Sequence, residues 1–62
     1  MSFLEYVTAR RIEKAQAILR ENPETLIKTV ALTCGFSDPL YFSKVFKNIA
    51  GCAPTEYANR PD

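Results

Sequence analysis

The first third of the chain repeats apolar residues at the spacing of an α-helix. The expected inner stripe of this segment is made by Leu4, Val7, Ile12, Ala15, Ile18 and Leu19. Ser2 and Glu5 have the spacing of a capping box, which favours a helix start at this point. Pro23 disfavours the helical conformation in the residue before it, so the helix should end near residue 21. The pattern therefore predicts one long amphipathic helix at the start of the chain.

A second, shorter stripe follows the loop at residues 22–25. Its apolar positions are Ile27, Val30, Ala31 and Cys34, which indicate a helix over about 26–34. Thr25 is the expected cap, because its hydroxyl can accept a hydrogen bond from an unpaired amide at the helix start. Gly35 is the expected end, since glycine readily takes the left-handed backbone that closes a helix.

A third helix is predicted to begin at Ser37 or Asp38, with Pro39 in its first turn. Its expected inner face is Phe42, Val45, Phe46 and Ile49, and its expected outer face is Leu40, Ser43, Lys44 and Lys47. Gly51 should end it. A last short helix should start at Ala53-Pro54 and fold Tyr57 back onto the core, with residues 60–62 fraying.

The stretch 30–46, V-A-L-T-C-G-F-S-D-P-L-Y-F-S-K-V-F, thus reads as two helices joined by a tight turn. Ala31 is small enough to let the second helix cross close to the first, and Phe36 should fill the junction between them. These features are typical of a helix-turn-helix, the all-α unit that many proteins use to read DNA.

Composition narrows the choice of function only a little. The 62 residues suffice for one small domain, and a formal net charge of +1 neither favours nor excludes a nucleic-acid partner. Locally, however, residues 27–50 carry Lys28, Lys44 and Lys47 against Asp38 alone. The chain has no histidine, no metal-ligand spacing and no glycine-rich phosphate loop, so we expect neither an enzyme nor a cofactor.

Cys34 and Cys52 leave two readings open, a pair of free thiols or a disulfide. The lack of a secretion signal favours free thiols and a cytoplasmic protein. No apolar run reaches the roughly 18 residues of a membrane span, so no membrane partner is expected.

Three pieces of the chain resemble the AraC/XylS-type bacterial transcription regulators. They are E-Y-V-T-A-R-R-I-E-K-A-Q-A-I-L, then I-K-T-V-A-L-T-C-G-F-S-D-P-L-Y-F-S-K-V-F-K, then G-C-A-P-T-E-Y. The resemblance implies two helix-turn-helix units joined by a long helix. Residues 1–22 would be this linking helix, 25–51 the second unit and 53–60 a closing helix, all within one partial domain over 1–62. The capping box that the family often carries at Leu26 and Thr29 is absent here.

The resemblance also implies that a first helix-turn-helix unit precedes Met1. A short internal sequence similarity agrees with this. The segments S-F-L-E-Y-V at 2–7 and A-P-T-E-Y-A at 53–58 share a Glu-Tyr pair at the same offset, as the ends of two repeated units would. The expected partners are double-stranded DNA, the missing first unit or another chain, and RNA polymerase as a further candidate.

In such a unit, the leading end of the second helix enters the major groove of DNA. The expected DNA-contacting residues are Pro39, Leu40, Tyr41, Ser43, Lys44 and Lys47. Ser43 and Lys44 could reach base edges, Lys47 suits a phosphate, and Tyr41 lies at the border. The alternative function is a protein-interaction or oligomerisation module, which would use the exposed face of the long first helix.

Overall fold

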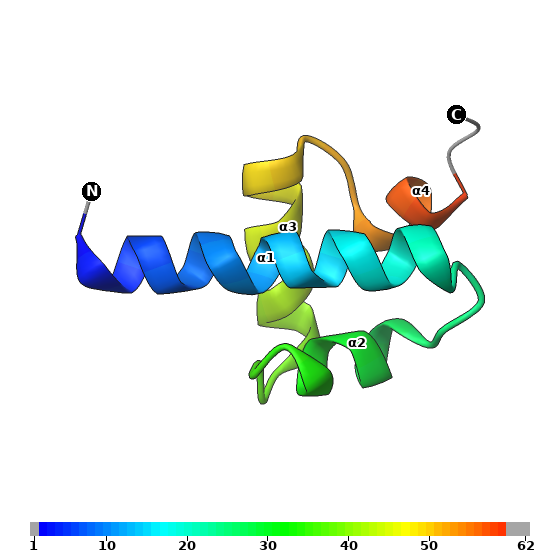
Figure 1. The fold of residues 1–62 in the computed structure, drawn as a ribbon, viewed down its shortest axis with the longest axis horizontal. Coiled ribbons are helices and arrows are strands. Elements are labelled where there is room, and N and C mark those ends of the chain that lie inside the picture. Colours follow the sequence, from blue (N-terminus) through cyan, green and yellow to red (C-terminus); the bar gives the residue numbers. More distant parts are fainter. Residues whose placement is uncertain (1, 60–62) are drawn as a thin grey trace.

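The computed structural model describes residues 2–59, which form four helices and no strand. They are α1 (Phe3–Glu21), α2 (Ile27–Thr33), α3 (Pro39–Ala50) and α4 (Pro54–Ala58). Figure 1 shows α1 running along the length of the molecule, with α2 beside it, α3 crossing behind it at a steep angle and α4 near its C-terminal end. The predicted all-α fold, a long helix followed by a helix-turn-helix pair and a short last helix, is confirmed.

The long helix α1 begins at the predicted capping box. The Ser2 hydroxyl accepts from the Glu5 amide at 3.1 Å, and the Glu5 carboxylate accepts from the Ser2 amide at 3.4 Å. At the other end, the amide of Asn22 donates to the carbonyl of Ile18 at 2.8 Å. A helix of 19 residues is about 28 Å long. It therefore accounts for most of the 33 Å long axis of the molecule.

The start of α2 differs from the prediction. Leu26, and not Thr25, occupies the N-cap position, and no side chain caps the helix. Thr25 is still part of the loop, where its amide donates to the carbonyl of Asn22 at 3.0 Å. The predicted hydroxyl cap is therefore wrong, because the turn after α1 is one residue longer than the sequence pattern suggested.

The turn between α2 and α3 has the predicted left-handed glycine. Gly35 has φ +93°, and its amide donates to Leu32 while the Phe36 amide donates to Ala31. These two bonds form a Schellman motif, which satisfies carbonyls that the end of a helix would otherwise leave unpaired. Next, the Asp38 carboxylate accepts from the Leu40 amide at 3.0 Å and caps α3.

The core lies where α2 and α3 pack against the second half of α1. Its buried residues are Ile12, Ala15, Leu19, Val30, Ala31, Cys34, Phe36, Phe42 and Phe46. A row of aromatic rings runs through this core, with centroid distances of 5.1 Å from Phe36 to Phe42, 5.7 Å from Phe42 to Phe46 and 5.5 Å from Phe46 to Tyr57. The predicted inward placement of Phe36, Phe42, Phe46 and Tyr57 is thus confirmed.

Two residues of the predicted inner stripes lie largely outside. Leu4 is 72% exposed and Ile49 is 47% exposed. Figure 1 shows that the N-terminal turns of α1, which carry Leu4, extend past α2 and α3, while Ile49 lies in the last turn of α3. The predicted fraying of residues 60–62 lies outside the described residues. Within 2–59, no helix is long and apolar enough to cross a membrane.

Candidate nucleic-acid interface

One stripe of α3 carries the residues expected to meet DNA. Leu40, Ser43, Lys44 and Lys47 follow one another at steps of three, one and three, so they share one face of the helix. Leu40 is 76% exposed, both lysines are exposed and Ser43 is half-buried. Phe42 and Phe46, on the opposite side, are completely buried. The core therefore holds α3 so that this stripe, which we call the α3 outer stripe, faces away from the protein.

The other two predicted residues lie at the border of the α3 outer stripe. Pro39 is half-buried at the first position of the helix, where its missing amide leaves no donor unpaired. Tyr41 is 57% exposed, and its ring lies 6.2 Å from that of Phe36. Tyr41 belongs to the neighbouring stripe of α3, together with Val45, Asn48 and Ile49.

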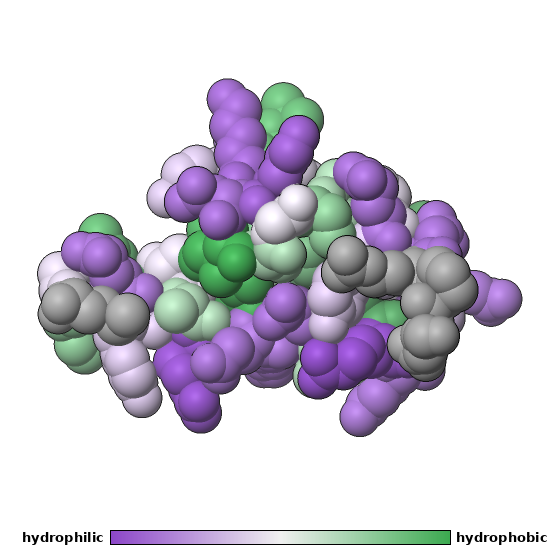
Figure 2. Space-filling model, turned by 90° about the horizontal axis from the view of Figure 1, so that it is seen from above, coloured by the Kyte–Doolittle hydropathy of each residue, from purple (hydrophilic) through white to green (hydrophobic). Residues whose placement is uncertain are grey.

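That neighbouring stripe faces α1 across a shallow groove. The α1 side of the groove is lined by Leu4, Glu5, Thr8 and Ala9, and the α3 side by Tyr41, Val45, Asn48 and Ile49. Figure 2 shows hydrophobic side chains gathered at this place, beside the N-terminal end of α1. Phe3 and Tyr6 are also exposed, at 82% and 54%. The two functions considered from the sequence thus fall on two different faces, the α3 outer stripe and this groove.

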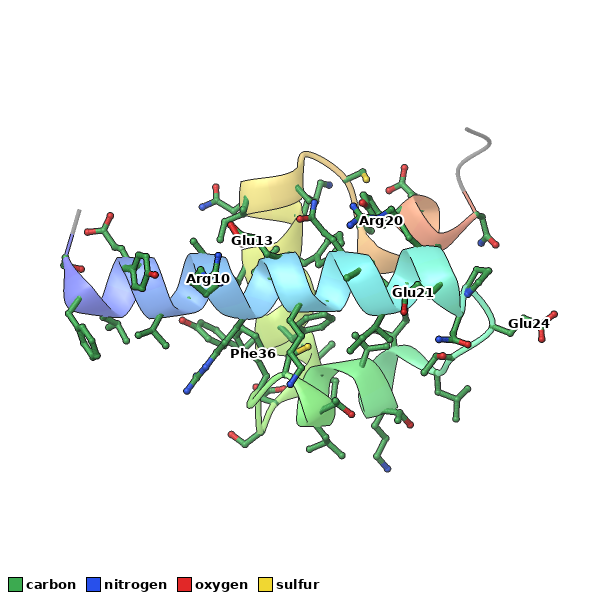
Figure 3. The ribbon with its side chains drawn as sticks, in the orientation of Figure 1. Arg10, Glu13, Arg20, Glu21, Glu24 and Phe36 are labelled. Atoms are coloured by element: carbon green, nitrogen blue, oxygen red, sulfur yellow. The ribbon has the colours of Figure 1, made fainter. Side chains whose placement is uncertain are left out.

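The charges near the helix-turn-helix include a cation that sequence reasoning missed. Arg11 of α1 is exposed, and its guanidinium Cζ lies 6.0 Å from the centroid of the Phe36 ring. Its neighbour Arg10 is paired with Glu13 at 3.0 Å (Figure 3). The spacing places Arg11 at the edge of the buried face, four positions before the core residue Ala15, but it does not say that the turn lies beside it.

The described residues show no metal site and no reactive thiol in the core. No group of three or more histidine, cysteine or acidic side chains within 2–59 is placed to hold a metal ion. Cys34 and Cys52 are free thiols. Burial raises the pKa of the Cys34 thiol, an effect that the nearby positive charge of Lys14 partly opposes, so Cys34 is a core residue and a poor nucleophile.

Comparison with known proteins decides the family. A helix-turn-helix domain family of the AraC type matches residues 1–60. The chain belongs to this AraC-type helix-turn-helix family. The family and the relatives named below support a DNA-binding module of a bacterial transcription regulator.

Relatives of this family cover almost all of the chain. It is 38% identical over 60 residues to the HTH-type transcriptional activator RhaR of Mannheimia succiniciproducens, which is 97% of this chain and 21% of that protein. It is 40% identical over 57 residues to the Msm operon regulatory protein of Streptococcus mutans, covering 92% of this chain and 20% of the relative. An uncharacterized HTH-type transcriptional regulator of Escherichia coli, YpdC, is 43% identical over 60 residues, with 97% and 21% coverage.

The AraC-type chain described here therefore spans about a fifth of the length of the curated relatives it matches. No solved structure gives a significant match. The geometry of the interface is therefore that of the four helices of this chain, without a related solved structure beside it.

Proposed function

We propose that α3 enters the major groove of double-stranded DNA with its leading end and that the α3 outer stripe makes the contacts. The observation that carries this proposal is the complete burial of Phe42 and Phe46 beneath a stripe whose lysines are exposed. An α-helix fits the major groove, where base edges present a sequence-dependent pattern of donors and acceptors. The second helix of a helix-turn-helix docks in this way when its apolar face is buried in the core and its polar face is exposed, and α3 meets both conditions.

Each residue of the interface has a role that follows from its chemistry. Lys44 reaches a guanine edge or a phosphate, while Ser43 donates to or accepts from a base. Leu40 contributes apolar contact, as with a thymine methyl group. Pro39 and Tyr41 lie at the border, and Lys47, one turn further along, pairs with a phosphate.

This surface favours positioning over discrimination. Residues 39–47 contain no arginine, asparagine or glutamine, the side chains that recognise guanine or adenine with two hydrogen bonds at once. We infer that the module adds phosphate attraction and shape fit, and that much of the sequence selectivity of the regulator lies elsewhere.

A salt titration tests the proposal. The chain is titrated with a mixed-sequence DNA duplex at several salt concentrations, and binding is followed by fluorescence anisotropy. The logarithm of the binding constant should fall linearly with the logarithm of salt, with a slope of about −0.9 for each phosphate contacted. Absence of binding at low salt, or binding that ignores salt, would refute the proposal.

The apolar groove supports a further partner for the regulator as a whole. Since the relatives are about five times longer than this chain, we infer that another helical unit, the first helix-turn-helix or a second chain, covers the exposed N-terminal turns of α1. One relative is named as a transcriptional activator, one as a transcriptional regulator and one as an operon regulatory protein, which makes RNA polymerase a candidate partner. A DNA-binding regulator of this kind would act in the cytoplasm and without catalysis of its own.

The second candidate function is self-association through that same face. Phe3, Leu4 and Tyr6 are all more than half exposed on adjacent turns of α1, and exposed apolar clusters commonly mark protein-binding surfaces. Sedimentation at increasing concentration distinguishes the two functions. A concentration-dependent dimer that does not bind the duplex would favour this second candidate over DNA binding.

A further inference from the structure

Arg11 is held at the turn of the helix-turn-helix although it belongs to the long helix. Its Cζ and Nε atoms both lie 3.3 Å from the position that a Cβ on residue 35 would take. The same guanidinium lies 6.0 Å from the centroid of the buried Phe36 ring. Figure 3 shows Phe36 below α1, near the turn that leads into α3. Arg11 therefore brings a positive charge to the leading end of α3.

This charge has no partner inside the described part of the protein. Within residues 2–59 the ion pair is that of Arg10 with Glu13, and the Arg11 side chain makes no hydrogen bond there. The nearest acid in sequence to the turn, Asp38, uses its carboxylate to cap the Leu40 amide. The guanidinium lies within cation–π distance of the Phe36 ring, a contact that uses none of its N–H groups, so these stay available to oxygen acceptors.

We propose that Arg11 is a DNA-phosphate ligand of this module, held by Phe36 over Gly35 so that its free N–H groups bind a backbone phosphate beside the bases met by α3. The assignment rests on the proposed DNA-binding function and adds to it a contact from a helix outside the helix-turn-helix. Arginine suits the role because its planar fork binds two phosphate oxygens at once. The glycine matters as well, because a Cβ at residue 35 would lie 3.3 Å from the guanidinium and push it away by a few tenths of an ångström.

The contact also ties two elements together. Phe36 packs on Tyr41 and Phe42 in the first turns of α3, with centroids 6.2 Å and 5.1 Å away. The guanidinium of Arg11 and the first turns of α3 thus contact the same ring, that of Phe36. A phosphate bound by Arg11 would therefore have a defined position relative to α3. Arg11 would set the register of α3 on the duplex, which phosphate contacts do in other DNA-binding proteins.

The test compares two neighbouring arginines of the same chain. Arg11→Met and Arg10→Met remove the same charge from adjacent positions of α1, but Arg10 is paired with Glu13 and Arg11 is not. Duplex affinity is measured over a range of salt for the parent chain and both variants. We expect Arg11→Met to make the salt slope shallower by about 0.9 and to weaken binding roughly tenfold at low salt. Arg10→Met should leave the slope near that of the parent.

The substitution Arg11→Lys distinguishes the effect of the positive charge on binding from an effect of residue 11 on folding. Lysine keeps the positive charge, so it should restore the salt slope while losing part of the affinity, because an ammonium cannot form the two-pronged contact. Thermal unfolding of each variant shows that binding is compared between folded proteins. A structural role alone would lower the melting temperature and leave the slope unchanged.

Three results would overturn the proposal. Equal slopes for Arg11→Met and Arg10→Met would show that Arg11 contacts no phosphate. A slope for Arg11→Lys as shallow as that of Arg11→Met would show that the charge at this position is not what matters. A parent chain without salt-dependent binding would overturn the proposed function and this contact together, whereas a parent that binds normally isolates the failure to Arg11.

Discussion

The guanidinium of Arg11 covers Gly35, with its Cζ atom 3.3 Å from the site of a Cβ that the glycine lacks. Gly35 also has φ +93°, a conformation that residues with side chains rarely adopt. The positive φ thus favours glycine at the end of α2, and a side chain there would in addition press on Arg11. The left-handed backbone at Gly35 ends α2 and lets the chain turn toward α3. The Arg11 side chain of α1 lies close to this same residue.

The first prediction separates these two reasons with a second glycine. Gly51, which ends α3, has φ +88°, but a Cβ there would meet nothing within 4 Å. Gly51→Ala should therefore cost only the backbone strain, about 1–2 kcal/mol. Gly35→Ala should cost more, and Gly35→Val more again because its branched side chain resists positive φ. Thermal unfolding followed by circular dichroism measures this order, which equal melting temperatures for all variants would contradict.

Lys44 provides a test of the α3 outer stripe. Lys44→Ala should weaken duplex binding severalfold and leave the melting temperature within a few degrees, because the side chain is exposed and supports no packing. Lys14→Ala is the matched control, since it removes the same charge from an exposed position of α1. Unchanged affinity of Lys44→Ala at moderate salt, or equal losses for the two variants, would refute the role assigned to Lys44.

The last turn of α1 is joined to α4 by a polar contact that can be removed on its own. Arg20 donates a 2.8 Å hydrogen bond to the hydroxyl of Tyr57, whose ring meets Phe46 edge-on. Tyr57→Phe keeps the ring and loses the bond, so it should cost about 0.5–1 kcal/mol. Tyr57→Ala also loses the ring and should cost about 2 kcal/mol or more. Denaturant unfolding measures both, and an equal loss for the two variants would show that the ring contributes nothing.

The two cysteines should differ in their reaction with a thiol reagent. Burial raises the pKa of Cys34, so at a given pH less of it is the reactive thiolate, and the core shields it as well. Cys52 is half-buried in the loop after α3 and should be modified first. Cys52→Ser should leave one slow thiol that reacts quickly only in denaturant. Fast modification of folded Cys52→Ser would show that Cys34 is accessible.

Much of the fold follows from local patterns. The capping box at Ser2 and Glu5, the proline after Asp38 and the glycines at 35 and 51 mark the helix ends at the places where the structure has them. Each of these signals acts through hydrogen bonds or backbone angles within a few residues, which is why one sequence suffices to read them. The α2 start lacks such a signal, and there the predicted cap was wrong.

Tertiary packing decided the rest. The spacing of apolar residues shows which side of α1 is apolar. How much of that side is buried depends on where α2 and α3 pack against it, so Leu4 remains exposed while Ile12 is buried. Residues far apart in the chain meet only when α3 crosses α1, and this crossing brings Arg11 to Gly35 and Phe36. The spacing of residues along one helix determines which of its faces is apolar and which is polar. The distance between a cation on one helix and a turn on another depends on how the two helices cross, which no local pattern contains.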